Sequence, residues 1–244
     1  MPTFFVASEA IAPPNVRITG PLLHHLRASL RLQAGEILSL IDDQGIRYRT
    51  EITEVTNRAV IGRIIDQTPP PAKPSTSLVL AQALLKGEKM DWVIQKATEL
   101  GVDRIVPILA GHSVVRPRAD RIEHQRARWQ RIAWEASQQS ERCSVPVMDE
   151  PRTVTQLLVN SKNARTKILL AERSNGASLS RLSFPADGDV WLLIGPEGGW
   201  EKEEMREAIE EGFTPVTLGP RILRAETAAI AAVTVVQSRL GALE

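Results

Sequence analysis

The sequence predicts two domains, a small β-barrel at the N-terminus and an α/β domain with a largely parallel sheet after it. Apolar and polar residues alternate over 46–53, the period of a strand with one buried face. Four prolines between residues 69 and 74 predict a stiff connector that neither a helix nor a central strand would contain. After residue 77, short apolar runs alternate with helical patterns, which is typical of α/β domains.

The first domain is expected over residues 1–70, followed by a linker at 71–76. Its helix should run from Pro21 to Leu32, with Leu23, Leu26 and Leu30 on the buried side. Short strands are expected at 4–6, 36–41, 46–53 and 59–65, with a turn at 42–45. Several short strands and one helix in about 70 residues favour a barrel that folds as its own module.

The second domain is expected over residues 77–244, with helices covering both faces of a parallel sheet. Buried strands are expected at 78–80, 105–106, 145–147, 168–171, 190–194 and 216–218. The expected helices are 88–100, 119–140, 154–160, 201–211 and 226–240.

Composition excludes several classes of protein. A single cysteine, Cys143, cannot form an internal disulfide or a zinc cluster, so we expect no metal. No apolar run approaches the ~20 residues of a membrane-spanning helix, and the first residues lack a signal peptide, so a cytoplasmic protein is expected. The formal net charge is only +1, yet six arginines lie between His112 and Arg131. That segment is either a polyanion-binding face or a solvated helix with ion pairs.

Two expected strand ends share a glycine-proline form, Ile194–Gly199 and Leu218–Arg224. Ligands bind beyond the carboxyl ends of parallel strands, and Gly195, Gly198, Gly199 and Gly219 would permit positive φ and a close approach of the main chain. Apolar side chains beside free peptide groups suit a flat heterocycle. Neither G-x-G-x-x-G nor Gly-Lys-Ser/Thr is present, so a dinucleotide or a triphosphate is not expected. Either loop alone could be an ordinary turn; the two together favour a ligand site.

These loops, Ile194-Gly195-Pro196-Glu197-Gly198-Gly199 and Leu218-Gly219-Pro220-Arg221-Ile222-Leu223-Arg224-Ala225-Glu226-Thr227-Ala228, closely resemble the signature of the ribosomal RNA small subunit methyltransferase E family, of the SPOUT class. Lys86–Met90, Gln95–Val102 and Trp129–Arg142 resemble further family segments. The resemblance implies a PUA-like RNA-binding barrel and a dimeric catalytic domain with a deep trefoil knot. It also implies S-adenosylmethionine as cofactor and N3 of a uridine in 16S ribosomal RNA as the methyl acceptor.

The site residues follow from the loops and the resemblance together. Arg224 should face the uracil and stabilise developing charge, or else form a salt bridge to Glu226 or Glu197. Glu197 is a weaker candidate for the base that removes the N3 proton. The expected cofactor contacts are Leu170, Ala171, Ile194, Gly195, Gly199, Leu218, Gly219, Ile222, Leu223 and Thr227.

RNA contacts are expected on a basic stripe formed by His24, Arg27 and Arg31, at positions i, i+3 and i+7 of the first helix. A solvated helix face is the alternative. The stripe would be extended by Lys86, Lys89, Arg116 and Arg118.

The chain departs from the family pattern at Thr3, where a basic residue is frequent, and at Gly111-His112-Ser113, which replaces Glu-Arg-Ser/Cys. These departures leave two competing functions open. One is an RNA-docking protein that holds the cofactor without transferring the methyl group. The other is an enzyme that acts on transfer RNA or on the large subunit.

Overall fold

The structure is a computed structural model that describes residues 3–72, 75–172 and 177–243. The chain divides into two compact units. One contains residues 1–73 together with 137–144, and the other contains 74–136 and 145–244. The sequence gives no sign that 137–144 groups with the first unit. Residues 73 and 74 of the expected linker lie outside the described residues.

The first unit contains a six-stranded sheet in the order β1-β4-β5-β6-β3-β2. The pair β1–β4 is parallel and the other neighbours are antiparallel. The register of β5 on β6 shifts between Arg49 and Thr50 and again between Ile52 and Glu54, and such irregularities bend and twist a sheet. The strands are β1 (Thr3–Phe5), β2 (Ile11–Ala12), β3 (Asn15–Ile18), β4 (Ile37–Ile41), β5 (Arg47–Val55) and β6 (Val60–Thr68); a short 3-10 helix, η1, covers Ser8–Ala10.

The helix of this unit, α1 (Gly20–Ala28), buries Leu23 and Leu26 in a core with residues of the sheet. It is shorter than predicted. Arg31 has φ 51°, and the Leu32 N–H donates to the Leu26 carbonyl at 3.0 Å, so the chain turns back after the helix. As a result Leu32 is buried and Leu30 is 42% exposed, which makes the expectation of a buried Leu30 wrong.

The second unit contains an eight-stranded sheet in the order β10-β8-β7-β13-β11-β14-β12, with β9 on β8, and every pair is parallel. The strands are β7 (Thr76–Ala83), β8 (Arg104–Leu109), β9 (Val147–Met148), β10 (Arg152–Thr153), β11 (Thr166–Leu170), β12 (Ala177–Ser178), β13 (Gly188–Ile194) and β14 (Thr214–Thr217). The helices are α2 (Lys89–Glu99), α3 (Ala119–Gln139), α4 (Val154–Asn160), η2 (Leu179–Arg181), α5 (Lys202–Glu210) and α6 (Ala225–Arg239).

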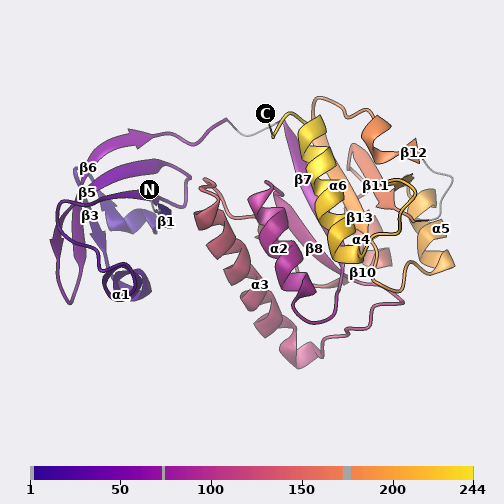
Figure 1. The fold of residues 1–244 in the computed structure, drawn as a ribbon, viewed down its shortest axis with the longest axis horizontal. Helices are drawn as coiled ribbons and strands as arrows, with labels where there is room; N and C mark the ends of the chain where they lie inside the picture. Colours follow the sequence, from indigo (N-terminus) through magenta and orange to yellow (C-terminus); the bar gives the residue numbers. More distant parts are fainter. Residues whose placement is uncertain (1–2, 73–74, 173–176, 244) are drawn as a thin grey trace. The chain divides into compact units, whose positions relative to one another are not determined.

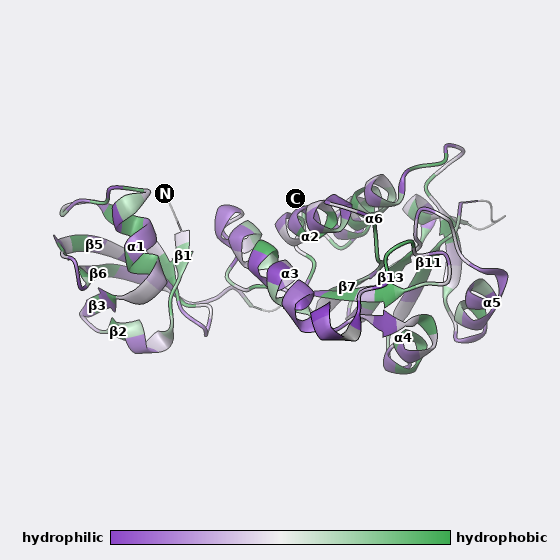
Figure 2. Cartoon of the chain, turned by 90° about the horizontal axis from the view of Figure 1, so that it is seen from below, coloured by the Kyte–Doolittle hydropathy of each residue, from purple (hydrophilic) through white to green (hydrophobic). Residues whose placement is uncertain are grey.

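Helices cover both faces of this sheet, as predicted (Figures 1 and 2). On one face α2, α3 and α6 pack over Leu80 and Leu192, with Trp129 of α3 fully buried. On the other face α4 and α5 pack over Ala81 and Leu193. Strands buried on both faces read as continuous apolar runs, which is why the sequence predicts them well. The trefoil knot that the resemblance implies stays a prediction.

Candidate functional site

A pocket of about 200 Å³ lies at the carboxyl edge of the parallel sheet, where the segments after β11, β13 and β14 meet. These three strands are neighbours in the sheet, so their following loops are brought to one place. Eight of the ten expected cofactor contacts line the pocket: Leu170, Ala171, Ile194, Gly195, Gly199, Leu218, Gly219 and Leu223. The other two do not: Ile222 is 60% exposed and Thr227 faces solvent.

The glycines of the two loops serve different purposes. Gly199 and Gly219 have φ of 74° and 116°, as predicted, a region that favours glycine. Gly195 and Gly198 do not have positive φ, so the conformational freedom that glycine permits is not used at these two positions. A Cβ on Gly195 would lie 3.0 Å from the indole ring of Trp200, and one on Gly198 would lie 2.9 Å from the Cβ of His112. These two positions are glycine because neighbouring side chains pack against their backbone.

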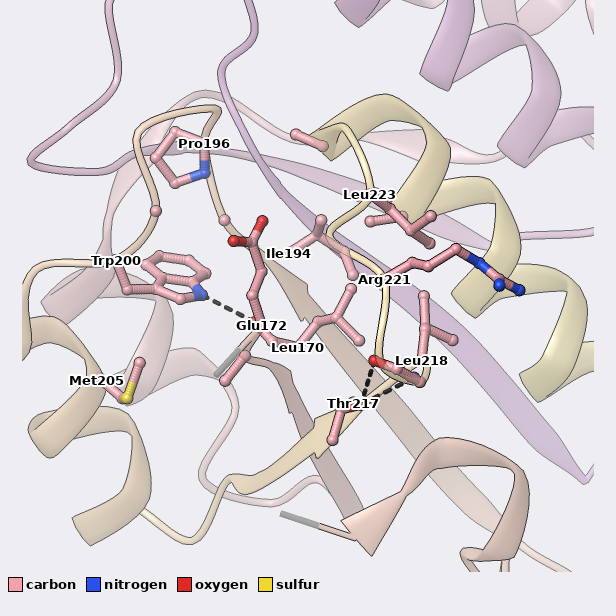
Figure 3. A pocket seen from close by; sticks show the side chains of 16 residues that line it. Leu170, Glu172, Ile194, Pro196, Trp200, Met205, Thr217, Leu218, Arg221 and Leu223 are labelled. Carbon is pink, nitrogen blue, oxygen red and sulfur yellow. Dashed lines mark hydrogen bonds between the residues drawn. The ribbon is translucent and has the colours of Figure 1, made fainter. Parts of the chain in front are cut away.

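Trp200 connects two of the loops that form the pocket. Its Nε1–H donates to the carbonyl of Leu170 at 3.1 Å (Figure 3). Its ring also lies against Gly195. The sequence places Trp200 directly after the glycine loop, but nothing in a single sequence distinguishes this aromatic residue from a core residue. The lining residues that sequence reasoning missed are Glu172, Pro196, Trp200, Met205, Thr217, Arg221, Ala225 and Ala228.

Main-chain groups around the pocket are only partly free. The peptide N–H and C=O of Gly195, Leu218 and Leu223 have no hydrogen-bond partner among the described residues. Gly199 differs, because its N–H donates to the Pro196 carbonyl at 3.0 Å and its own carbonyl lies 3.2 Å from Nδ1 of His112. Gly199 therefore shapes the loop, whereas the other three can bind a ligand through the main chain.

Two charged side chains line the otherwise mainly apolar pocket, Glu172 and Arg221. In Figure 3 the Glu172 carboxylate points into the pocket, between Trp200 and Ile194 in this view, and Arg221 extends beside Leu223. Neither side chain forms an ion pair with any residue that the structure describes. The pocket thus offers apolar walls, free peptide groups, one carboxylate and one guanidinium, and this combination suits a ligand with a flat apolar part and a charged part.

Glu197 is held by an ion pair beside the pocket and does not line it. Its carboxylate accepts from Lys89 Nζ at 3.1 Å and from the Lys86 N–H at 3.4 Å, and Lys89 also lies 3.5 Å from Glu226. Burial raises the pKa of the Glu197 carboxyl, but hydrogen bonds from its own backbone N–H, Lys89 and the Lys86 N–H outweigh this, so the pKa lies below its usual value. A carboxylate of low pKa is a weak base, and this geometry favours a structural role.

Arg224 is exposed between two residues that line the pocket, Leu223 and Ala225. The carboxylates with which it could have paired, Glu197 and Glu226, are instead bound to Lys89. Within the described parts of the chain the Arg224 side chain has no hydrogen bond or ion pair, which leaves its guanidinium available at the rim of the pocket. The salt-bridge alternative for Arg224 was wrong.

The expected RNA contacts are only partly brought together. His24 and Arg27 lie on α1, where Arg27 donates to Asn57 at 2.5 Å, but Arg31 follows the helix in a left-handed conformation and does not continue a helical stripe. In the second unit Lys86 is exposed, and Lys89 is engaged with Glu197 and Glu226. Arg116 donates to the Gly111 carbonyl at 3.1 Å, and Arg118 lies 3.4 Å from Asp120. His24, Arg31, Lys86, Arg116 and Arg118 are exposed to solvent, whereas Arg27 and Lys89 are half-buried.

Neither a metal-binding cluster nor a membrane-spanning helix is found among the described residues. No cluster of three or more His, Cys, Asp or Glu side chains there could hold a metal ion. Every helix described is too short or too polar to cross a membrane.

Comparison with known proteins covers both units. Residues 72–237 match the model of an RNA methyltransferase domain, and residues 18–65 match that of an RNA methyltransferase PUA domain. The chain is 35% identical to ribosomal RNA small subunit methyltransferase E of Synechocystis over 91% of its length and 73% of the relative's. It is 31% identical to the Bacillus subtilis protein of the same name, with 91% and 90% of the two chains covered.

A solved structure extends the likeness to the fold. The crystal structure of ribosomal RNA small subunit methyltransferase E from Neisseria gonorrhoeae, bound to S-adenosyl methionine, superposes with a TM-score of 0.85 at 31% identity. The match covers 98% of this chain and 97% of that chain.

Proposed function

Because this chain belongs to the ribosomal RNA small subunit methyltransferase E family, we propose that it transfers the methyl group of S-adenosylmethionine to N3 of one uridine in 16S ribosomal RNA. The observation that carries the proposal is the pocket between the two glycine-proline loops. It lies at the ligand-binding edge of the sheet, in a chain whose solved relative holds S-adenosyl methionine.

The residues of the pocket fit this cofactor. Leu170, Ile194 and Leu218 provide apolar walls for an adenine ring, and the free peptide groups of Gly195, Leu218 and Leu223 can hydrogen-bond its edge. We propose that Glu172 faces the positively charged part of the cofactor. When bound, S-adenosylmethionine supplies an activated methyl group on a sulfonium, which needs no metal.

Transfer to N3 requires that the N3 proton leaves, and negative charge then develops on O2 and O4 of the uracil. A cation placed beside the base would stabilise that charge more in the transition state than in the ground state. Arg224 is the residue we propose for this role, because it is unpaired among the described residues and adjoins the pocket through Leu223 and Ala225. Glu197 remains the weaker candidate for the base, since hydrogen bonds from its own backbone N–H and from Lys89 keep the pKa of its carboxyl below the usual value.

RNA binding is proposed for the first unit, which contains the PUA match, with His24, Arg27 and Arg31 as contacts to phosphate. Residues 1–70 would form this RNA-binding domain and residues 77–244 the methyltransferase domain. Lys86, Lys89, Arg116 and Arg118 would add phosphate contacts from the second domain.

A homodimer is also proposed. Thr227, Ile230 and Thr234 follow one another at helical spacing on α6, with both threonines exposed and Ile230 half-buried, and we propose that a second copy covers this weakly polar face.

The test is a comparison of ribosomal RNA from a strain with and without the gene. Digestion of 16S RNA to nucleosides should show N3-methyluridine in the first strain and its loss in the second. Purified protein with labelled S-adenosylmethionine should restore the nucleoside on RNA from the second strain. If N3-methyluridine were unchanged in 16S RNA and the label entered transfer RNA or large-subunit RNA, the proposed acceptor would be wrong.

A further inference from the structure

The loop after β8, residues 110–113, packs directly on the loop that carries Gly195 and Gly199. It contains Gly111-His112-Ser113. Nδ1 of His112 lies 3.2 Å from the Gly199 carbonyl, and the Cβ of His112 lies where a side chain on Gly198 would have to be. One residue of this loop thus touches two consecutive glycines of the pocket loop.

The same loop is fixed from the other side by α5. The Glu204 carboxylate accepts from the Gly111 N–H at 2.7 Å and from the Glu201 N–H at 3.0 Å. Gly111 leaves room for the Glu201 side chain, which occupies the place where a Cβ at position 111 would lie. A turn closed by the Ser113 N–H and the Ala110 carbonyl at 3.0 Å completes the loop. His112 is therefore presented to Gly199 from an anchored segment.

The hydrogen bond between His112 and Gly199 can have only one direction, with His112 as the donor. A carbonyl oxygen can only accept, so the 3.2 Å contact is a hydrogen bond when Nδ1 carries the proton. Gly199 has φ 74°, and its N–H is bound to the Pro196 carbonyl, so the bond from His112 fixes the other half of this turn. The loop between Pro196 and Trp200 then has both polar groups of Gly199 satisfied within the protein.

We propose that His112 is a positioning residue for the cofactor, acting through the Gly199 carbonyl to hold the Gly195–Gly199 loop in its binding conformation. This inference rests on the proposed function, because the pocket must bind S-adenosylmethionine for the loop's conformation to affect affinity. His112 does not itself line the pocket.

The experiment compares two variants by calorimetric titration with S-adenosylmethionine. His112→Phe keeps an aromatic ring and the Cβ beside Gly198 but removes the donor. His112→Asn keeps a donor two bonds from Cβ, where Nδ1 stands in histidine. We expect His112→Phe to weaken binding about three- to tenfold, the loss that one hydrogen bond of this kind gives, and His112→Asn to stay within about twofold of the unchanged protein. The thermal unfolding midpoint of each variant monitors the fold.

The outcomes separate the inference from its premise. If the unchanged protein binds the cofactor and His112→Phe binds it equally well, the positioning role is wrong. Equal weakening of both variants would also overturn it, because packing and not the donor would then matter. If the unchanged protein fails to bind S-adenosylmethionine, the proposed function falls and this inference falls with it.

Discussion

Replacing Gly195 with alanine should weaken cofactor binding through Trp200. The added carbon would lie 3.0 Å from Cε2 and Nε1 of the indole, where unstrained contacts are about 3.5–4.0 Å, so the ring must retreat by roughly 0.5–1 Å. Its bond to the Leu170 carbonyl is already 3.1 Å and would be broken by such a shift. Overpacking of this kind costs about 1–3 kcal/mol, which corresponds to about 5- to 150-fold weaker binding if the cost falls on the bound conformation.

The assay is calorimetric titration with S-adenosylmethionine, and two controls isolate the cause. Gly212→Ala introduces strain at a glycine with φ 90° that does not line the pocket, so it should lower the unfolding midpoint without changing affinity. The double variant Gly195→Ala, Trp200→Phe should lose less binding free energy for S-adenosylmethionine than the two single variants lose together, because the smaller ring makes room for the added methyl group. Unchanged affinity in Gly195→Ala, or strict additivity in the double variant, would refute the reasoning.

Three further variants test the charges around the pocket. Arg224→Ala should lower turnover by about 100-fold with cofactor affinity unchanged; lost binding with intact turnover per bound cofactor would contradict its role. Glu172→Gln should weaken binding of S-adenosylmethionine about fivefold, and binding of S-adenosylhomocysteine, which lacks the sulfonium charge, by less. Titration with both compounds measures this, and an equal loss for the two would contradict the role of Glu172. The pKa of the Glu197 carboxyl is lowered in the folded protein, so its ionised form stabilises the fold at every pH above its ordinary value of 4.5. This stabilisation is lost as the pH falls through the lowered pKa. Lys89→Met should reduce the decrease of the thermal unfolding midpoint at acidic pH. If the midpoint of this variant depended on pH as in the unchanged protein, the ion pair would not be its cause.

The fold was largely predictable because its strands and helices have strong periodic patterns. The parallel strands are buried on both faces, and Gly101, which has φ 89°, stops the chain from continuing α2 beyond its last residue, Glu99, and the C-cap, Leu100. The end of α1 was not predictable, because leucines continue at helical spacing to Leu30 while the chain already turns. What decides the end is the hydrogen bond from the Leu32 N–H to the Leu26 carbonyl, with Leu32 in the core. The helical spacing of apolar residues in the sequence does not show which of them are buried in the core.

Half of the residues that line the pocket were predicted, including Leu170 and Ala171 after β11 as well as residues of the two glycine-proline loops. The glycine-proline loops identify it because residues after neighbouring parallel strands meet at one edge, and that rule holds for the loops after β13 and β14. Glu172 and Trp200 were missed because their roles depend on contacts between separate loops, such as the 3.1 Å bond from Trp200 to Leu170. Ile222 was wrongly included because an apolar residue beside two lining residues was expected to share their direction.

Gly111, Gly195 and Gly198 show that a glycine near a ligand loop can be required by its neighbours instead of by its own dihedral angles. At each position a Cβ would meet a particular side chain, of Glu201, Trp200 and His112 respectively. The requirement is therefore reciprocal. A larger residue at position 111 needs a different placement of Glu201, whose backbone N–H is tied to Glu204, which in turn binds the Gly111 N–H. Gly111 and His112 therefore depend on each other. The absence of a side chain at Gly111 leaves the space in which α5 anchors the loop, and that loop places His112 against Gly199.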